Sequence, residues 1–142
     1  MTALSPELME AYRRTEYQVA DGSYAFTLRI GEASDSLRTC HFAHGVECSA
    51  FLTACNPRSV PRAEVENADA MKRLARELED EGYFVLSGRG VDPTGAWPGD
   101  PSFLVLGITE PDAVALGRRF DQHAVLFAGE DATPGLVIVS DR

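Results

Sequence analysis

Two short segments hold most of the residues in this chain whose types and spacing could bind a ligand. The first, Asn56-Pro57-Arg58-Ser59, follows the compact apolar run SAFLTA and precedes an expected helix. A strand end, a proline turn and a helix start would gather backbone N–H groups, an amide, a guanidinium and a hydroxyl around one point, which suits a phosphate or a carboxylate. Local turn and cap hydrogen bonds explain these residue types equally well, but not the occurrence of Arg58 and Arg62 together.

The second segment is a glycine-rich stretch, residues 88–98, that contains Arg89, Asp92 and Trp97. It is neither a dinucleotide fingerprint nor a phosphate-binding loop, because no helix opens after it and no Gly-Lys-Ser/Thr follows. A loop of this length is uncommon unless it is functional or packed on itself. Trp97 would either pin the loop to the core or stack on a ligand ring, and pinning is the commoner state of a tryptophan.

We therefore expect a small-ligand site where these two loops meet, provided that the second loop folds back over the strand end. Asn67, about two turns into the expected helix, could line the same cleft. The expected ligand is a small anion, either a nucleotide or another metabolite. The predicted ligand-binding residues are Asn56, Arg58, Ser59, Asn67, Arg89, Asp92 and Trp97. The sequence names no catalytic residue and no cofactor, so it leaves open whether the chain is an enzyme.

The cysteines and histidines invite thiol or metal chemistry, but their spacing argues against both. Four of them lie within nine residues: Cys40, His41, His44 and Cys48. Thiolates and imidazoles are the usual zinc ligands, but Gly45 ends the expected helix, so one tetrahedral site would need an awkward turn. We predict no metal site. Cys55 stands at a strand end, where burial as a small hydrophobic side chain is the simpler interpretation, because no spacing selects a histidine as its base.

Hydrophobic spacing predicts the elements that must position these loops. Apolar residues three and four apart predict a helix over about residues 61–81, ended by Gly82. Before it we expect a helix in SPELMEAYRRTEYQV followed by an extended lead-in, a strand in YAFTLRIG, a helix in SDSLRTCHFAHG and a strand in SAFLTA. After it we expect strands in YFVLSG, SFLVLGI, HAVLFAG and LVIVSD, with a helix from Thr109 between the second and the third.

The order of these elements predicts the fold class. From Ser49 onward it contains the pattern βαββαβ, which is the split βαβ arrangement of ferredoxin-like folds. We therefore expect an α+β fold, a two-layer sandwich with a mainly antiparallel sheet, a ferredoxin-like core and additional helix and strand elements at the N-terminus. A length of 142 residues predicts a single domain over residues 1–142.

Composition and charge exclude several function classes. With 13 basic and 22 acidic residues, the net charge is −9, so we expect no non-specific nucleic-acid binding. No apolar run is long enough to cross a bilayer, and the first residues do not resemble a signal peptide, which predicts a cytoplasmic protein without a membrane partner. Three cysteines without such a signal indicate reduced thiols. The oligomeric state cannot be predicted.

Several short motifs, each weak alone, form a specific combination. They are YxxTxY from Tyr12, AFxTAxNPxS from Ala50, EN at 66–67, GxGxDPxGxWP from Gly88, SFLVLGI from Ser102, and Gln122. In these the chain resembles the bacterial domain-of-unknown-function family 3293, over about residues 12–128. The resemblance implies a small, stand-alone, cytoplasmic bacterial protein and no activity. Cys55 and the cysteine–histidine cluster are not features of that family, which lowers the expectation of thiol or zinc chemistry.

Two other function classes stay as alternatives to ligand binding. A non-catalytic interaction module could use the glycine-rich loop or the final strand LVIVSD to dock a partner by edge pairing. A small hydrolase could use Asp92 and His123 as acid and base, although no spacing rule supports that pair.

Overall fold

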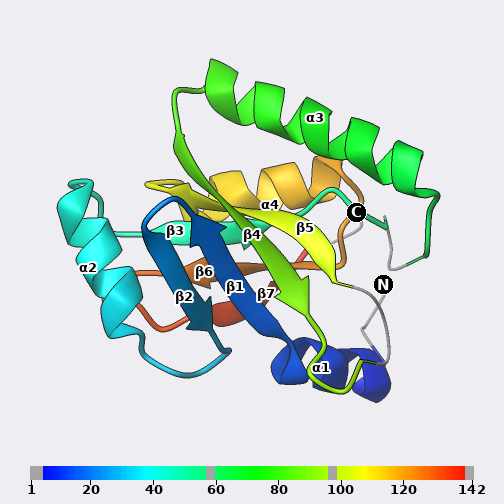
Figure 1. Cartoon of the computed structure of the whole chain (residues 1–142), viewed down its shortest axis with the longest axis horizontal. Coiled ribbons are helices and arrows are strands. Elements are labelled where there is room, and N and C mark those ends of the chain that lie inside the picture. The colour runs from blue at the N-terminus through cyan, green and yellow to red at the C-terminus, as the bar shows by residue number, and fades with distance from the viewer. Residues whose placement is uncertain (1–4, 57–59, 96–98, 140–142) are drawn as a thin grey trace.

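An antiparallel sheet runs through the molecule and positions the other elements (Figure 1). The computed structural model describes residues 5–56, 60–95 and 99–139. In that part of the chain the strand order is β2 (Tyr24–Leu28), β1 (Glu16–Asp21), β4 (Phe84–Val91), β5 (Asp100–Leu106), β3 (Ser49–Leu52), β6 (Ala124–Ala128) and β7 (Gly135–Ile138). The helices are α1 (Pro6–Arg14), α2 (Asp35–Ala43), α3 (Glu64–Asp80) and α4 (Glu110–Arg119). The predicted α+β class with an antiparallel sheet is confirmed.

Helix α3 follows the predicted periodicity but begins later than expected. Its buried residues are Ala70, Met71, Leu74 and Leu78, and Gly82 takes a positive φ of 83° just after its end. Arg62 lies before the helix, and its backbone N–H donates to the Asn56 side chain (2.9 Å). The segment before α3 is thus tied to the end of β3. Within the described ranges, no helix is both long and apolar enough to cross a membrane.

A hydrophobic core lies on each face of the sheet, because successive residues of a strand point to opposite sides. The first core contains Ala50 and Val105 together with α3 and α4, which lie on the same side of the sheet (Figure 1). The second core contains their direct neighbours, Phe51 and Leu104, together with residues of β1, β2 and α2. Burial on both faces explains why the central strands are continuous apolar runs.

The sheet curls around the second core, and its two edge strands come together at one end. The backbone N–H of Gly31 donates to the Pro134 carbonyl (2.8 Å), and that of Ser34 donates to the Ala132 carbonyl (3.0 Å). These bonds join the segment after β2 to the segment before β7. Helix α1 lies where β4 ends, away from α2 (Figure 1). The predicted two-layer sandwich has one core, between its two layers, so this second core was not expected.

The N-terminal side of the sheet differs from the prediction in two respects. The expected extended lead-in is strand β1, which forms a hairpin with β2 around a turn at Gly22 in the expected polar break. The expected loop at 88–98 is also shorter than predicted, since β4 continues to Val91 and pairs with β1 through Gly88 and Gly90. Glycine marks a close approach of two strands there, and the connection between β4 and β5 begins only at Asp92.

The cysteine–histidine cluster at α2 satisfies its polar atoms within the fold. His41 is 4% exposed, and its Nε2 lies 2.8 Å from Ser49 Oγ. The Cys48 thiol donates to the Ile108 carbonyl (3.1 Å), and His44 Nδ1 lies 3.0 Å from the Cys40 carbonyl. Burial raises the pKa of the Cys40 and Cys48 thiols, which disfavours the thiolate form that a metal ligand needs. Among the described residues, no three such side chains converge on one point.

The buried imidazole of His41 should make the stability of the fold depend on pH. Burial lowers the pKa of His41 below its usual value, because the imidazolium would lose its hydration. Below about pH 6.5 the unfolded chain therefore binds a proton that the folded chain does not, so the free energy of unfolding falls as the pH falls. We expect a steeper loss of stability between pH 7 and pH 5 for the wild type than for His41→Gln, measured by urea unfolding. Equal slopes would contradict this assignment.

Candidate functional site

A pocket of about 350 Å³ lies beneath α1, at the end of the sheet that this helix covers. Its walls are mainly apolar and come from α1 and from the sheet, as shown by Leu8, Ala11, Phe51 and Leu126. One group of its polar residues lies around the end of β3 and the starts of β5 and β6: Thr53, Cys55, Asn56, Asp100, Ser102 and Gln122. Three hydroxyl-bearing residues, Tyr12, Thr15 and Tyr17, line it from α1 and β1. Apolar walls with a few polar groups are the usual make-up of a small-molecule site.

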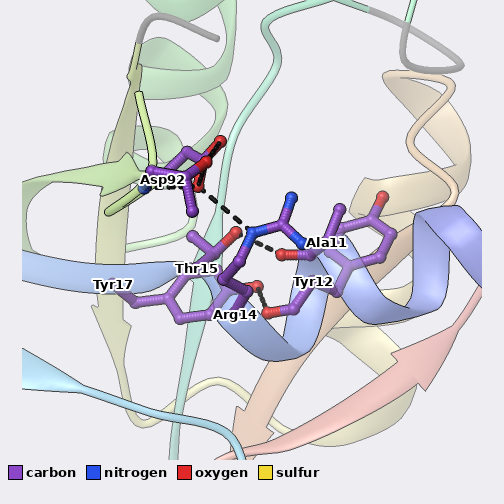
Figure 2. Close-up of polar contacts among 7 residues, drawn as sticks. Ala11, Tyr12, Arg14, Thr15, Tyr17 and Asp92 are labelled. Atoms are coloured by element: carbon purple, nitrogen blue, oxygen red, sulfur yellow. Dashed lines mark hydrogen bonds and ion pairs between the residues drawn. The ribbon is translucent and has the colours of Figure 1, made fainter. Parts of the chain in front are cut away.

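Contacts at the C-terminal end of α1 hold this helix over the pocket (Figure 2). The Thr15 hydroxyl donates to the Ala11 carbonyl (2.7 Å), and the Tyr17 hydroxyl donates to the Tyr12 carbonyl (2.8 Å). Arg14 Nε donates to Asp92 Oδ1 at 3.3 Å, and the Asp92 side chain is fully buried. Burial raises the pKa of the Tyr17 phenol, so this hydroxyl stays protonated and keeps its donor role. These contacts fix α1 to β1 and to the residue that follows β4.

Asn56 ties three elements together at the polar end of the pocket. Its backbone N–H donates to Asn67 Oδ1 (2.9 Å), and its Nδ2 donates to Asp100 Oδ1 (3.1 Å). Its Oδ1 accepts from the backbone N–H of Arg62 (2.9 Å) and from Asn67 Nδ2 (2.8 Å). Asn56 also has a positive φ of 47°, which asparagine tolerates better than most residues. The residue therefore joins the end of β3 to α3 and to the start of β5.

These bonds predict that Asn56 and Asn67 stabilise the fold jointly. Asn56→Gly keeps the positive φ accessible but removes the side-chain hydrogen bonds, so we expect a loss of about 2 kcal/mol in the free energy of unfolding. Asn67→Ala removes the partner of two of the bonds and should cost a similar amount. Because the two residues share contacts, the double variant should lose less than the sum of the two single losses. Urea unfolding of the four proteins measures this, and strict additivity would contradict the shared role.

Burial raises the pKa of both ionisable groups at the polar end, Cys55 and Asp100. Cys55 is 2% exposed, and burial raises the pKa of its thiol, which points at the Pro101 carbonyl (3.7 Å). A nucleophilic cysteine needs the opposite shift. Burial also raises the pKa of the Asp100 carboxyl, while the Arg89 guanidinium and the Asn56 amide partly offset this effect. The end of the pocket therefore suits binding through hydrogen bonds better than attack by a thiolate.

Gln122 closes the polar end from the other side. Its Nε2 donates to the Cys55 carbonyl (3.1 Å) and to the Phe120 carbonyl (3.2 Å). Asp100 and Gln122 thus flank the short segment of Cys55 and Asn56, one bonded to each residue. This placement follows from the strand order, because β3 lies between β5 and β6 and is antiparallel to both.

The residues predicted from the sequence do not all meet at this pocket. Asn56 lines it, and Asn67 contacts Asn56 from α3. Arg89 lies on β4 and donates to the Gly99 carbonyl (2.8 Å), and Asp92 is held by Arg14 and Thr94 under α1. Neither Arg89 nor Asp92 lines the pocket. The other three predicted residues, Arg58, Ser59 and Trp97, lie outside the described residues.

Sequence reasoning missed Asp100, Gln122 and the whole contribution of α1. Gln122 belongs to the motifs that carried the family resemblance, and Asp100 lies two residues after the glycine-rich stretch 88–98, so both stood close to the expected site. Nothing in the local pattern shows that α1 covers them. His123, the proposed partner of Asp92 in a hydrolase, does not line the pocket, and its carbonyl accepts from the Val139 N–H (2.9 Å).

Comparison with known proteins places the central part of the chain in a sequence family. A family model described as "Protein of unknown function (DUF3293)" matches residues 52–125. The match begins at the end of β3 and ends in β6, so it includes Asn56, Asp100 and Gln122 but not α1. No curated protein and no solved structure matches the chain.

Proposed function

The chain belongs to the DUF3293 family of proteins of unknown function, as its motifs indicated, and we propose that it binds a small metabolite in the pocket beneath α1. The family supplies no activity, so the proposal rests on the pocket itself. In this proposal the apolar body of the ligand packs between α1 and the sheet, near Leu8, Phe51 and Leu126. Its polar end lies at Asn56, Asp100 and Gln122.

The observation that carries the proposal is a group of polar side chains gathered at one end of a pocket whose walls are mainly apolar. A cavity left by imperfect packing would have uniformly apolar walls, whereas here the polar side chains of three separate segments gather at one end. Those segments are held in place by hydrogen bonds between them, from Asn56 to Asp100 and from Gln122 to the Cys55 carbonyl. A site whose polar groups are fixed before the ligand arrives costs less ordering on binding.

Benzyl alcohol is a suitable first probe, because it combines a small apolar body with one hydroxyl. In a titration of protein labelled at its leucine methyl groups, we expect NMR shift changes at Leu8 and Leu126, which line the pocket from α1 and from β6. Leu78 is buried in α3 and does not line the pocket, so its methyl signals provide an internal control. Shift changes confined to leucines outside the pocket would contradict the proposal.

A second candidate keeps the anionic ligand expected from the sequence and places it between α3 and α4. A groove of about 240 Å³ there is lined by three arginines, Arg62, Arg73 and Arg119, and by Asn67. Arg119 forms an ion pair with Glu77, and two further acids, Glu66 and Asp121, line the groove. Inorganic phosphate should shift the amide signals of Arg62 and Asn67 if this site is used, and Arg73→Gln should weaken that response. Unchanged signals at high phosphate would exclude it.

We also propose the finer fold description, a two-layer sandwich with a ferredoxin-like core, for the segment from β3 to β6. The strand order β4-β5-β3-β6 supports it, because β3 lies in the sheet beside β5 and β6, with α3 and α4 on one face. The bacterial origin, the cytoplasmic location and the alternative roles as an interaction module or a small hydrolase stay predictions.

A further inference from the structure

We propose that the ligand of this pocket presents adjacent N–H donors at its inner end, as an amidine or an amino-substituted nitrogen ring does, and that Asp100 and Gln122 accept them. This inference deepens the proposed function and rests on it. It specifies the chemical class of the ligand: an N–H-rich head group joined to an apolar or aromatic body.

Each donor group at the polar end already makes at least one hydrogen bond within the protein. Thr53 Oγ1 donates to the Pro101 carbonyl (2.7 Å), and Ser102 Oγ donates to the Asp100 carbonyl (3.0 Å). Asn56 Nδ2 donates to Asp100 Oδ1, and Gln122 Nε2 donates to two carbonyls. A ligand that brings further acceptors to this end would have to displace one of these bonds, which costs free energy.

Most of the spare capacity at the polar end belongs to acceptors, since Asn56 Nδ2 keeps only one further N–H beside the one that it gives to Asp100. Asp100 Oδ2 and Gln122 Oε1 have no hydrogen-bond partner among the described residues, and a carboxylate oxygen can accept more than one bond. The orientation of the Gln122 amide is fixed by chemistry, because only its nitrogen can donate to the Cys55 and Phe120 carbonyls. The Asn56 amide is fixed in the same way, since its oxygen accepts from a backbone N–H. The excess of acceptors therefore does not depend on an arbitrary choice of amide orientation.

The charges in and around the pocket also favour a ligand head group with N–H donors. Asp100 is a pocket-lining carboxyl, whereas the described residues that line the pocket include no arginine, lysine or histidine. The nearby Arg89 donates to the Gly99 carbonyl and does not line the pocket. An anionic head group would meet the carboxylate without a compensating cation from these residues, and an N–H donor would be attracted to it. The apolar walls include the edge-to-face pair of Tyr17 and Phe51, 5.5 Å apart, which suits a ring as the ligand body.

Three ligands with one common body test this inference on the wild-type protein: benzamidine, benzamide and benzoate. They share the phenyl ring and differ in the head group, which is cationic with N–H donors, neutral with both donors and acceptors, or anionic with acceptors alone. Dissociation constants from leucine-methyl NMR titrations should rank benzamidine as the tightest and benzoate as the weakest, about tenfold apart or more.

Asp100→Asn then tests the residue assignment. We expect this variant to weaken benzamidine binding by about tenfold and to leave benzamide binding nearly unchanged, because only the charged acceptor is lost. Asp80→Asn makes the same substitution at an exposed position at the end of α3, away from the pocket, and should leave all three constants unchanged. The ranking in the wild type does not depend on whether Asp100→Asn folds.

The outcomes separate the two proposals. If benzoate binds as tightly as benzamidine, or more tightly, while benzyl alcohol still shifts the pocket methyls, the head-group inference is wrong and the pocket proposal survives. If neither the three ligands nor benzyl alcohol shift the pocket methyls, the proposed function itself fails. If benzamidine binds best but Asp100→Asn does not weaken it, the preference exists and its assignment to Asp100 is wrong.

Discussion

Gly88→Ala is expected to lower the free energy of unfolding by about 3 kcal/mol, whereas Gly90→Ala, two residues along the same strand, should change it by less than about 1 kcal/mol. A Cβ atom at Gly88 would lie 2.5 Å from the backbone oxygen of Gln18 and 2.9 Å from the Phe51 ring. At Gly90 the nearest atom would be a Thr15 methyl carbon at 3.7 Å, which is an ordinary contact.

The large effect at Gly88 arises because neither neighbour can move freely. Gln18 O belongs to the backbone of β1, which is paired with β4 on one side and with β2 on the other. Phe51 is a buried ring in the second core. Urea unfolding of the two variants measures the difference. Similar stabilities for Gly88→Ala and Gly90→Ala would show that β1 and β4 are not as close as the structure places them.

Gly90→Leu is expected to weaken the binding of benzyl alcohol and benzamidine while the protein stays folded. Gly90 lines the pocket and pairs with Tyr17, so a side chain at position 90 projects to the same face of the sheet as the Tyr17 ring. Its Cβ has room, and the rest of a leucine side chain would then occupy space that the probe needs. We expect binding to weaken by at least about tenfold, since the ligand and the new side chain compete for one volume.

Gly135→Leu provides a matched control for this substitution. Gly135 lies on the edge strand β7, outside the pocket, and a Cβ there would meet only the Phe127 carbonyl oxygen at 3.9 Å. The same change in side chain should therefore leave the dissociation constants unaltered. If Gly90→Leu keeps the wild-type affinity in the NMR titration, the probe binds elsewhere and the pocket assignment fails.

The sequence was sufficient to predict elements whose signals are local. Helix α3 was predicted because its core residues recur every three or four positions, and α4 because Thr109 and Asp112 form its cap, with Thr109 Oγ1 accepting from the Asp112 N–H (3.4 Å). The β1–β2 hairpin was missed although Tyr17 and Val19 alternate with polar neighbours, since the run is short and follows a helix directly. Gly88 and Gly90 were interpreted as loop residues, because a close contact between strands has no local signal in the sequence.

The same distinction explains how much of the site could be predicted. Asn56 could be selected because an asparagine before a proline at a strand end indicates either a turn or a ligand site. Asp100 and Gln122 could not be assigned to the same site, because they reach Asn56 and Cys55, respectively, only through the order β5-β3-β6, which the sequence does not specify. The position of α1 over the pocket depends on the burial of Asp92 and its ion pair with Arg14, two residues far apart in the chain.

The most direct test of the central claim, that the pocket beneath α1 binds a small ligand, is a measurement of nuclear Overhauser effects between bound benzyl alcohol and leucine methyl groups. The account predicts effects to Leu8 of α1 and to Leu126 of β6 in the same complex, because these residues line the same pocket from a helix and from the sheet. Effects only to leucines that do not line the pocket, such as Leu78, or effects that persist unchanged in Gly90→Leu, would contradict it.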